Sequence, residues 1–265
     1  MIYGSAWEHD MDFSQFAIMF KSIFLEGLAR PSGGVRTIIN LLSEKLEQQG
    51  LLVQYKSQVK KLHKDEHGIT GLTLTSGAKI TCRKVLSSAG YRETLNLFES
   101  KQEEDSRVTI GKMSFTESIL ILDKKPKEFG IEDAIIFANN SHDYNYRNPK
   151  KLFDSNSAVL CFPNNFMIDE EEEGIYRSTM MADYDCWNKL DRAEYLRSKK
   201  NVLNTSIELF HQHSNTQIQN VLFSDIFTPK TVKRYTHHEN GCVYGSPEKS
   251  RDGTTSVNGL YLMGT

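Results

Sequence analysis

The stretch Asn258-Gly-Leu-Tyr-Leu-Met-Gly-Thr265 ends the chain and decides how the rest of it is interpreted. Its apolar run has the length of a buried strand, and the run leads into a glycine turn. In open α/β sheets, ligands bind beyond the carboxyl ends of the strands, so we expect this strand to point its end at a ligand. A natural domain rarely ends on such an element, and the opposite end, Met1-Ile-Tyr-Gly4, begins without a first strand or a phosphate-binding loop. We therefore expect the chain to be the interior of a larger enzyme.

Composition excludes several classes of protein. The 265 residues could form one large domain or two ordinary ones, and contents of 38% hydrophobic and 25% charged residues are typical of a soluble globular protein. A formal net charge of −2 argues against a nucleic-acid partner, which would require a concentrated basic face. No apolar run approaches the roughly 18 residues needed to span a bilayer, and no secretory signal is recognisable.

The cysteines and histidines predict neither a disulfide framework nor a metal site. The four cysteines are far apart and include no CxxC pair, which is typical of reduced thiols in a cytoplasmic protein. They are Cys82, Cys161, Cys186 and Cys242. Among the histidines, His211 and His213 would point to different faces of a helix, and His237 and His238 would point oppositely on a strand. No metal ligand set is therefore expected.

The first third of the chain opens with helices. Residues 11–29 form an apolar, Phe- and Met-rich stretch that is either a core helix or the wall of an apolar pocket. The breaker cluster Arg30-Pro-Ser-Gly-Gly34 follows. Behind it, apolar residues at helical spacing from Val35 to Leu46 predict an amphipathic helix that ends at Gly50.

From Leu51 to Ala89 the period of the apolar residues changes to two, which predicts a meander of short strands. The expected strands are 52–55, 58–63, 69–75, 78–82 and 84–89. The last of them ends in the small residues Ser87-Ser-Ala-Gly90, where a backbone could approach a ligand closely, although a plain tight turn explains the pattern equally well.

A polar break at Glu99-Ser-Lys-Gln-Glu-Glu-Asp-Ser106 indicates a crossing between domains. Further strands are expected at 114–122, 134–138, 158–162 and 175–181, followed by a helix at 192–210. We therefore expect residues 107–228 to form a second, α+β domain, built on a mostly antiparallel sheet and inserted between two pieces of the first domain, 1–106 and 229–265.

No single motif identifies the chemistry, because the chain has no GxGxxG, no Walker loop and no GxSxG elbow. The order of its parts is more informative. A Pro-x-Gly-Gly turn opens a helix, a strand meander follows, and the chain ends with Asp225-Ile-Phe-Thr-Pro-Lys-Thr231, Gly241-Cys-Val-Tyr-Gly245 and the terminal strand. In this order and spacing the sequence resembles the phytoene desaturase-like branch of the FAD-dependent amine oxidase superfamily, which includes carotenoid desaturases, carotenoid isomerases and retinol saturases.

The resemblance implies a two-domain flavoenzyme whose fold is α/β plus α+β. An FAD-binding Rossmann-like domain, incomplete here without its N-terminal GxGxxG unit and its C-terminal flavin-binding helix, would carry the inserted substrate domain. FAD is the implied cofactor of the full-length parent, and we expect that this chain alone does not retain it.

The resemblance also assigns candidate site residues, each with a structural alternative. Val59 corresponds to a strand position beside the adenine, or is plain core. Gly33 and Gly34 correspond to a glycine pair near the flavin, or only punctuate the helix. Gly264 and Thr265 correspond to the start of the flavin turn. The substrate-side loop would contain Gly241, Tyr244 and Gly245, of which the glycines could simply shape a turn.

Three functions remain open from the sequence. The first is hydride transfer between a small apolar isoprenoid- or polyene-like substrate and flavin, with Phe13–Phe24 and Ser114–Leu122 suited to line a tunnel. The second is a flavin amine oxidase, for which aromatic rings beside the flavin, such as Tyr235 and Tyr244, would be needed. The third is a catalytically inactive remnant or binding module without FAD. No side chain identifies itself as catalytic. An apolar substrate favours a cytoplasmic protein with peripheral contact to a membrane, and the oligomeric state is not predicted.

Overall fold

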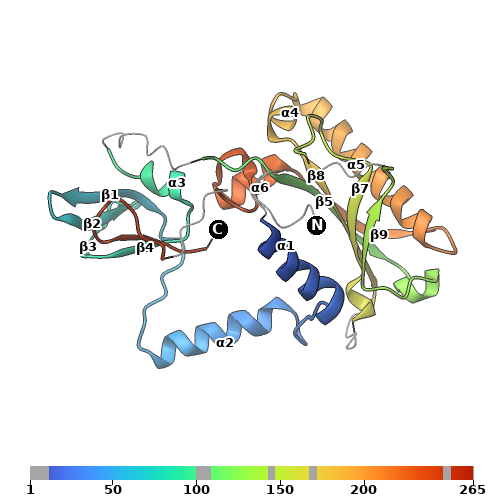
Figure 1. Ribbon diagram of the computed structural model, residues 1–265, viewed down its shortest axis with the longest axis horizontal. Helices are drawn as coiled ribbons and strands as arrows, with labels where there is room; N and C mark the ends of the chain where they lie inside the picture. The colour runs from blue at the N-terminus through green and yellow to red at the C-terminus, as the bar shows by residue number, and fades with distance from the viewer. Residues whose placement is uncertain (1–11, 100–108, 143–146, 167–171, 247–251, 265) are drawn as a thin grey trace.

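The computed structural model describes residues 12–99, 109–142, 147–166, 172–246 and 252–264. Within these ranges the strands form a three-stranded, a two-stranded and a five-stranded sheet. Figure 1 shows the two smaller sheets on one side of the molecule and the five-stranded sheet on the other, with α1 (Phe13–Phe20) and α6 (Pro229–Thr236) between them. The architecture is a mixture of helices and mostly antiparallel strands, as expected for the fold class.

The N-terminal helices form where the sequence predicts them, but the interpretation of residues 11–29 as a core helix is wrong, because none of the described residues there is buried. Asp12 caps α1 by accepting a hydrogen bond from the Gln15 N–H at 2.8 Å, and α1 continues into a π-helix, η1 (Lys21–Glu26). Gly34 starts α2 (Val35–Gln48), which ends two residues before Gly50. No residue of α1, η1 or α2 is buried.

The two smaller sheets are built from residues that are far apart in the sequence. The hairpin of β1 (Val59–Asp65) and β2 (Gly68–Leu74) is extended by β3 (Lys79–Thr81), with both pairings antiparallel. The short strand β4 (Val85–Ser87) pairs in parallel with β10 (Leu260–Leu262), near the end of the chain. Helix α3 (Tyr91–Leu95) follows β4 directly. A small core containing Leu62, Ile69, Phe98, Val257 and Leu260 holds these elements together.

The five-stranded sheet has the order β6-β7-β8-β5-β9, with every neighbouring pair antiparallel. Its strands are β5 (Ser114–Leu122), β6 (Ile135–Asn139), β7 (Ser157–Cys161), β8 (Gly174–Ala182) and β9 (Val221–Phe227). Side chains alternate between its two faces, so the even-numbered residues of β5 are buried and most of its odd-numbered ones are partly exposed.

One long helix covers one face of this sheet. Asp191 and Glu194 form a reciprocal capping box at the start of α5 (Arg192–His213). Its buried face packs on Leu120, Tyr176 and Met180 to form the largest core of the molecule. Figure 1 shows α5 against this face and α1 on the opposite side of the sheet.

The short elements that complete the fold lie in the connections, three of them between strands of the five-stranded sheet and one on the way back to β10. They are α4 (Tyr184–Asn188) and the 3₁₀ turns η2 (Pro126–Phe129), η3 (Pro163–Asn165) and η4 (Glu239–Gly241). Helix α6 and η4 lie on the path from β9 back toward β10.

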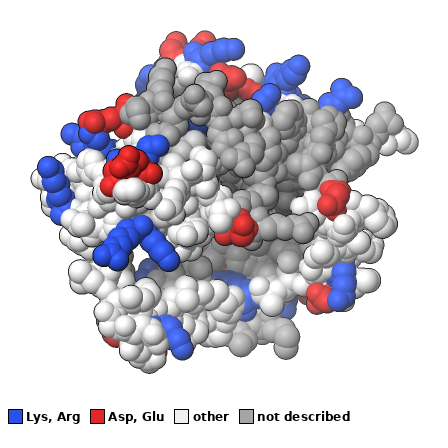
Figure 2. Space-filling view, turned by 60° about the vertical axis from the view of Figure 1, so that its left-hand side comes forward, with Lys and Arg blue, Asp and Glu red and all other residues white. Residues whose placement is uncertain are grey.

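Figure 2 shows one face of the molecule, on which the Lys and Arg side chains of the described residues lie among Asp and Glu side chains and form no extended basic area. No helix in the described ranges is both long enough and apolar enough to cross a membrane.

Two further sequence predictions were wrong, and several elements were not predicted. Residues 52–55 form no strand; Leu52 and Tyr55 are exposed, and the positive φ of 56° at Lys56 interrupts extended backbone. The two adjacent histidines do not lie on a strand, because His237 ends α6 in the left-handed conformation and His238 leads into η4. The elements α3, α6 and β9 were not predicted.

Candidate functional site

The parallel pairing of β4 with β10 places the carboxyl ends of two strands side by side. Leu262 lies opposite Ser87, and the Met263 N–H donates to the Ser87 carbonyl at 2.9 Å. Each strand then leads to a glycine with positive φ, 93° at Gly90 and 84° at Gly264. This is the arrangement in which α/β sheets bind ligands.

Gly264 is exposed, and a Cβ built on it would meet no atom within 4 Å outside its chain neighbours. This accessible, left-handed turn fits a cofactor that approaches bare backbone, as the predicted flavin turn would require. Thr265, the other residue predicted for that turn, lies outside the described residues.

A small pocket opens where β4 ends. It is formed by the start of α3, the segment leading into β5 and the loop after α6. Its lining residues are Gly90, Tyr91, Arg92, Glu93, Thr109, Ile110, Gly111, His238, Cys242, Gly245 and Ser246. Of the predicted site residues, only Gly245 lines this pocket, and Gly264 is connected to it through the β4–β10 pair.

Glycines allow backbones to cross closely at the pocket wall. A Cβ on Gly111 would overlap the carbonyl oxygen of Gly245, and one on Gly241 would overlap the carbonyl oxygen of Pro229. The Ser114 hydroxyl donates to the Gly241 carbonyl at 2.6 Å, which ties the loop to the first residue of β5. Gly241 and Gly245 therefore shape the loop, and whether they also face substrate stays a prediction.

Glu93 organises the polar side of the pocket. Its Oε1 accepts a hydrogen bond from the Glu239 N–H at 2.7 Å, which joins α3 to the loop after α6. His238 Nδ1 lies 3.2 Å from the Cys242 carbonyl within the same loop. Sequence reasoning did not identify Arg92, Glu93 or Cys242 as site residues, because the residues that meet here are separated by more than half of the chain.

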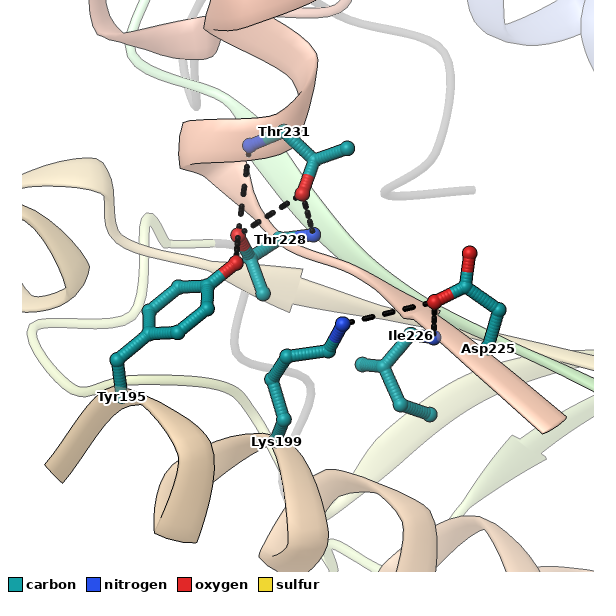
Figure 3. Close-up of polar contacts among 6 residues, drawn as sticks. All are labelled: Tyr195, Lys199, Asp225, Ile226, Thr228 and Thr231. Carbon is teal, nitrogen blue, oxygen red and sulfur yellow. Dashed lines mark hydrogen bonds and ion pairs between the residues drawn. The ribbon is translucent and has the colours of Figure 1, made fainter. Parts of the chain in front are cut away.

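Polar contacts fix the direction in which the chain returns from the sheet to the pocket. Figure 3 shows Thr228 at the junction of β9 and α6, where its hydroxyl caps Thr231 and lies 3.0 Å from the Tyr195 hydroxyl of α5. Nearby, Lys199 Nζ lies 3.5 Å from Asp225 Oδ1. The predicted motif Asp225–Thr231 therefore acts as a positioning element that anchors α6 to α5.

The two tyrosines expected beside a flavin amine oxidase site do not meet. Tyr244 packs edge-on against Phe115 with ring centroids 5.8 Å apart, and burial raises the pKa of its phenol. Tyr235 is 74% exposed, and its ring contacts Arg234 of the same helix. The described residues therefore show no paired aromatic rings from these two positions.

Gly33 and Gly34 lie beside the five-stranded sheet and do not line the pocket. Both have positive φ, and the guanidinium of neighbouring Arg30 donates to the Pro163 carbonyl at 3.5 Å. Pro163 opens η3 directly after β7, so this contact joins the glycine turn to the sheet. The turn also starts α2, in agreement with its structural interpretation.

Val59 begins β1 and packs against the small core of Leu62 and Ile69. A β-bulge follows it, since Val59 faces Leu74 while Lys61 faces Thr73, which leaves Lys60 without a cross-strand partner. A bulge exposes backbone groups that a ligand could use, but Val59 does not line the pocket.

The described histidines and carboxylates form no metal site: no cluster of three or more His, Cys, Asp or Glu side chains occurs in that part of the chain. His211 instead uses Nε2 to accept a hydrogen bond from the Ile218 N–H at 3.0 Å.

Known proteins resemble this chain both in sequence and in fold. The prolycopene isomerase of Daucus carota chloroplasts is 24% identical over 259 residues, which cover 90% of this chain and 40% of the relative. The corresponding protein of Arabidopsis thaliana is 24% identical over 264 residues, covering 90% of this chain and 42% of the relative. The chain thus spans about two fifths of the length of the curated relatives that it matches.

The crystal structure of an oxidoreductase from Methanosarcina mazei shares the fold with a TM-score of 0.57 at 12% identity, over 88% of this chain and 49% of that one. The similarity to prolycopene isomerases confirms the predicted phytoene desaturase-like resemblance. Residues 2–198 match the family model described as flavin containing amine oxidoreductase, which is well over half of the chain. The chain therefore belongs to the flavin containing amine oxidoreductase family.

Proposed function

We propose that this chain is part of an FAD-dependent oxidoreductase that transfers hydride between a small apolar, isoprenoid- or polyene-like substrate and flavin. The observation that carries the proposal is the parallel β4–β10 pair, which ends in the accessible turn at Gly264. Membership of the family supports FAD as the cofactor, and the similarity to prolycopene isomerases supports an apolar substrate.

We assign the sheets to two domains with different roles. The two smaller sheets, within 1–106 and 229–265, would belong to a Rossmann-like FAD-binding domain. The five-stranded sheet, within 107–228, would belong to the substrate domain. This arrangement is supported by the separate cores of the two groups of strands.

Residues of this chain would hold the cofactor mainly through backbone. Gly264 is exposed at the end of β10, and Val59 lies at the start of the bulged strand β1. When bound, the flavin supplies the hydride acceptor or donor, and the protein supplies position and exclusion of water. No side chain of the pocket is assigned a proton-transfer role.

A membrane surface is the proposed source of the apolar substrate. The apolar residues of α1, η1 and α2 that support this contact are widely exposed, for example Phe13 at 83% and Leu25 at 73%. Peripheral contact through such side chains requires no membrane-spanning helix.

FAD titration of the purified chain tests the cofactor part of the proposal. We expect the chain alone to bind FAD too weakly to retain it on desalting, so uptake is followed by flavin fluorescence at equilibrium. Gly264→Ala should weaken this uptake roughly tenfold, about 1.4 kcal/mol, because a methyl group would stand where the flavin approaches. Gly77→Ala is the matched control: its φ is 88°, a Cβ there also meets nothing within 4 Å, and it lies in the turn between β2 and β3.

A chain that takes up no FAD at any concentration tested would contradict the proposal for this polypeptide and support a binding module without flavin. Equal losses in Gly264→Ala and Gly77→Ala would show that backbone strain, and not flavin contact, explains the effect. Reduction of bound flavin by an alkylamine but not by a polyene would replace the substrate class with amines.

A further inference from the structure

The face of the five-stranded sheet that α5 does not cover is mostly apolar and only partly buried. Alternation along the strands assigns its members, because their register partners lie on the same face. The apolar members with partly exposed side chains include Ile119, Ile121, Phe137, Val159, Ile175 and Phe227. We refer to this surface as the open face.

The open face is bordered by two features that the sequence predicted to lie at the substrate site, the substrate-side loop and the Phe-rich N-terminal stretch. At one end, Phe115 contacts Tyr244 of the predicted substrate-side loop, with centroids 5.8 Å apart. At the other end, Phe137 lies 5.9 Å from Phe24, the last of a row of rings on α1 and η1. The row runs from Phe13 through Phe16 and Phe20 to Phe24, with successive centroid separations of 6.2, 6.1 and 5.0 Å.

An ion pair interrupts this apolar surface near its centre, and the register places Asp225 on the same face, opposite Ile119. Arg177 Nε donates to Glu117 Oε1 at 2.6 Å, and Nη2 contacts the same oxygen. Arg177 lies between Ile119 and Cys161 in the sheet register. The two side chains are 45% and 18% exposed, so the pair is half-sunk in the face while its outer atoms remain accessible.

Covering this pair with hydrocarbon would be unfavourable. The ligand would remove water from both charged groups without replacing the lost hydrogen bonds, and such desolvation is costly. A ligand that carries an oxygen at this point would instead satisfy them. Sites built to hydrogen-bond a hydroxyl discriminate strongly against analogues that lack it.

The charges at the ion pair determine which polar group of a ligand can lie beside it. Arg177 and Glu117 neutralise each other, and Arg30 beside Cys161 and Asp225 opposite Ile119 add one charge of each sign around them. A carboxylate would therefore lie beside an existing carboxylate, and an ammonium group beside an existing guanidinium. A hydroxyl is neutral, accepts a hydrogen bond from the guanidinium and donates one to the carboxylate. It therefore matches the pair better than either ion.

We propose that Arg177 and Glu117 are specificity-determining residues that select an elongated apolar alcohol over the hydrocarbon of similar skeleton. The ligand lies along the open face between Tyr244 and the aromatic row, with its hydroxyl at the ion pair. This inference rests on the proposed function, since it names the substrate class for that site.

Equilibrium dialysis of the 265-residue chain with radiolabelled farnesol tests the inference without using flavin. Unlabelled farnesol, farnesene, farnesoic acid and farnesylamine serve as competitors. We expect farnesol to bind about tenfold more tightly than farnesene, the difference that about one net hydrogen bond to a charged group supports. Farnesoic acid and farnesylamine should both bind more weakly than farnesol.

The double variant Glu117→Gln/Arg177→Met should bind farnesol and farnesene about equally, with farnesene affinity kept, because it removes both charges and leaves neither one unpaired. Arg177→Lys keeps a donor and should retain part of the preference if the double variant fails to fold. Arg197→Met, on the exposed side of α5, is the matched control and should keep the full preference.

Several outcomes would overturn the inference: tightest binding of the acid or the amine, an unchanged preference in the double variant, no binding of any competitor, or a concentration-dependent dimer that shields the open face. Its failure is distinguishable from that of the proposed function. A chain that prefers farnesol but takes up no FAD contradicts only the flavin chemistry, and a chain that takes up FAD without an alcohol preference contradicts only the role of the ion pair.

Discussion

The N-terminal helices and the five-stranded sheet show opposite relations between sequence pattern and burial. Helix α2 has a regular apolar stripe, yet none of its residues is buried, and Ile39 is 50% exposed. In the sheet, Leu120 and Leu122 alternate with their neighbours and are completely buried under α5. Periodicity therefore predicts that an element forms, but burial requires a partner that the pattern does not specify.

This difference implies that the free energy of unfolding is concentrated in one part of the molecule. Phe210 of α5 is fully buried and packs edge-on against Phe129 and Tyr176, each with centroids 5.1 Å away. Phe210→Ala should lower the free energy of unfolding by about 3–5 kcal/mol, because it leaves a cavity. Urea unfolding followed by circular dichroism measures the change.

Phe13→Ala is the control for this substitution, since Phe13 is 83% exposed on α1. It should change the free energy of unfolding by no more than about 0.5 kcal/mol. Similar losses in both variants would show that α1 is packed in solution and would remove the contrast between the two regions.

A buried hydroxyl cluster should give an intermediate effect. Ser206 lies on the buried face of α5, and its hydroxyl is 2.6 Å from that of Ser118 and 2.9 Å from that of Ser178 in the sheet. Ser206→Ala leaves the other two hydroxyls short of a partner and should cost about 1–3 kcal/mol of unfolding free energy.

The triple variant Ser118→Ala/Ser178→Ala/Ser206→Ala sharpens this test. It removes the unpaired groups along with the hydrogen bonds, so it should be less destabilising than Ser206→Ala alone in the same unfolding assay. Additive losses across the three positions would mean that the hydroxyls act independently and that the cluster has no cooperative role.

The same contrast explains how much of the fold could be predicted. The strand 114–122 was predicted with the bounds it has, since the short apolar run Ile119–Leu122 and the β-branched and aromatic residues before it are typical of a strand. Residues 52–55 have a similar composition but no neighbouring strand, and extended segments are not stable by themselves. The edge strand β9 was missed because four of its seven residues are exposed, which weakens the pattern.

The candidate site was less predictable than the fold. The terminal strand and its glycine turn pointed to a ligand at the carboxyl end, and the parallel pairing with β4 agrees with that expectation. Glu93 could not be identified, because its hydrogen bond to the Glu239 N–H depends on how α3 and α6 approach each other. Short helices with no distinctive motif give no local signal for such a contact.

The smallest expected change in stability concerns the exposed helices, where the effect should appear in binding. Replacing Phe13 with Ser should leave the free energy of unfolding within about 0.5 kcal/mol of its original value, because the side chain is already exposed. The same change should weaken sedimentation with phosphatidylcholine vesicles roughly tenfold, since burying a Phe side chain contributes about 1.5–3 kcal/mol. Leu196→Ser on α5, where Leu196 is 50% exposed, is the control and should not affect sedimentation. If Phe13→Ser and Leu196→Ser lower vesicle binding equally, the apolar surface of α1 has no special affinity for membranes, and its exposed rings must have another partner.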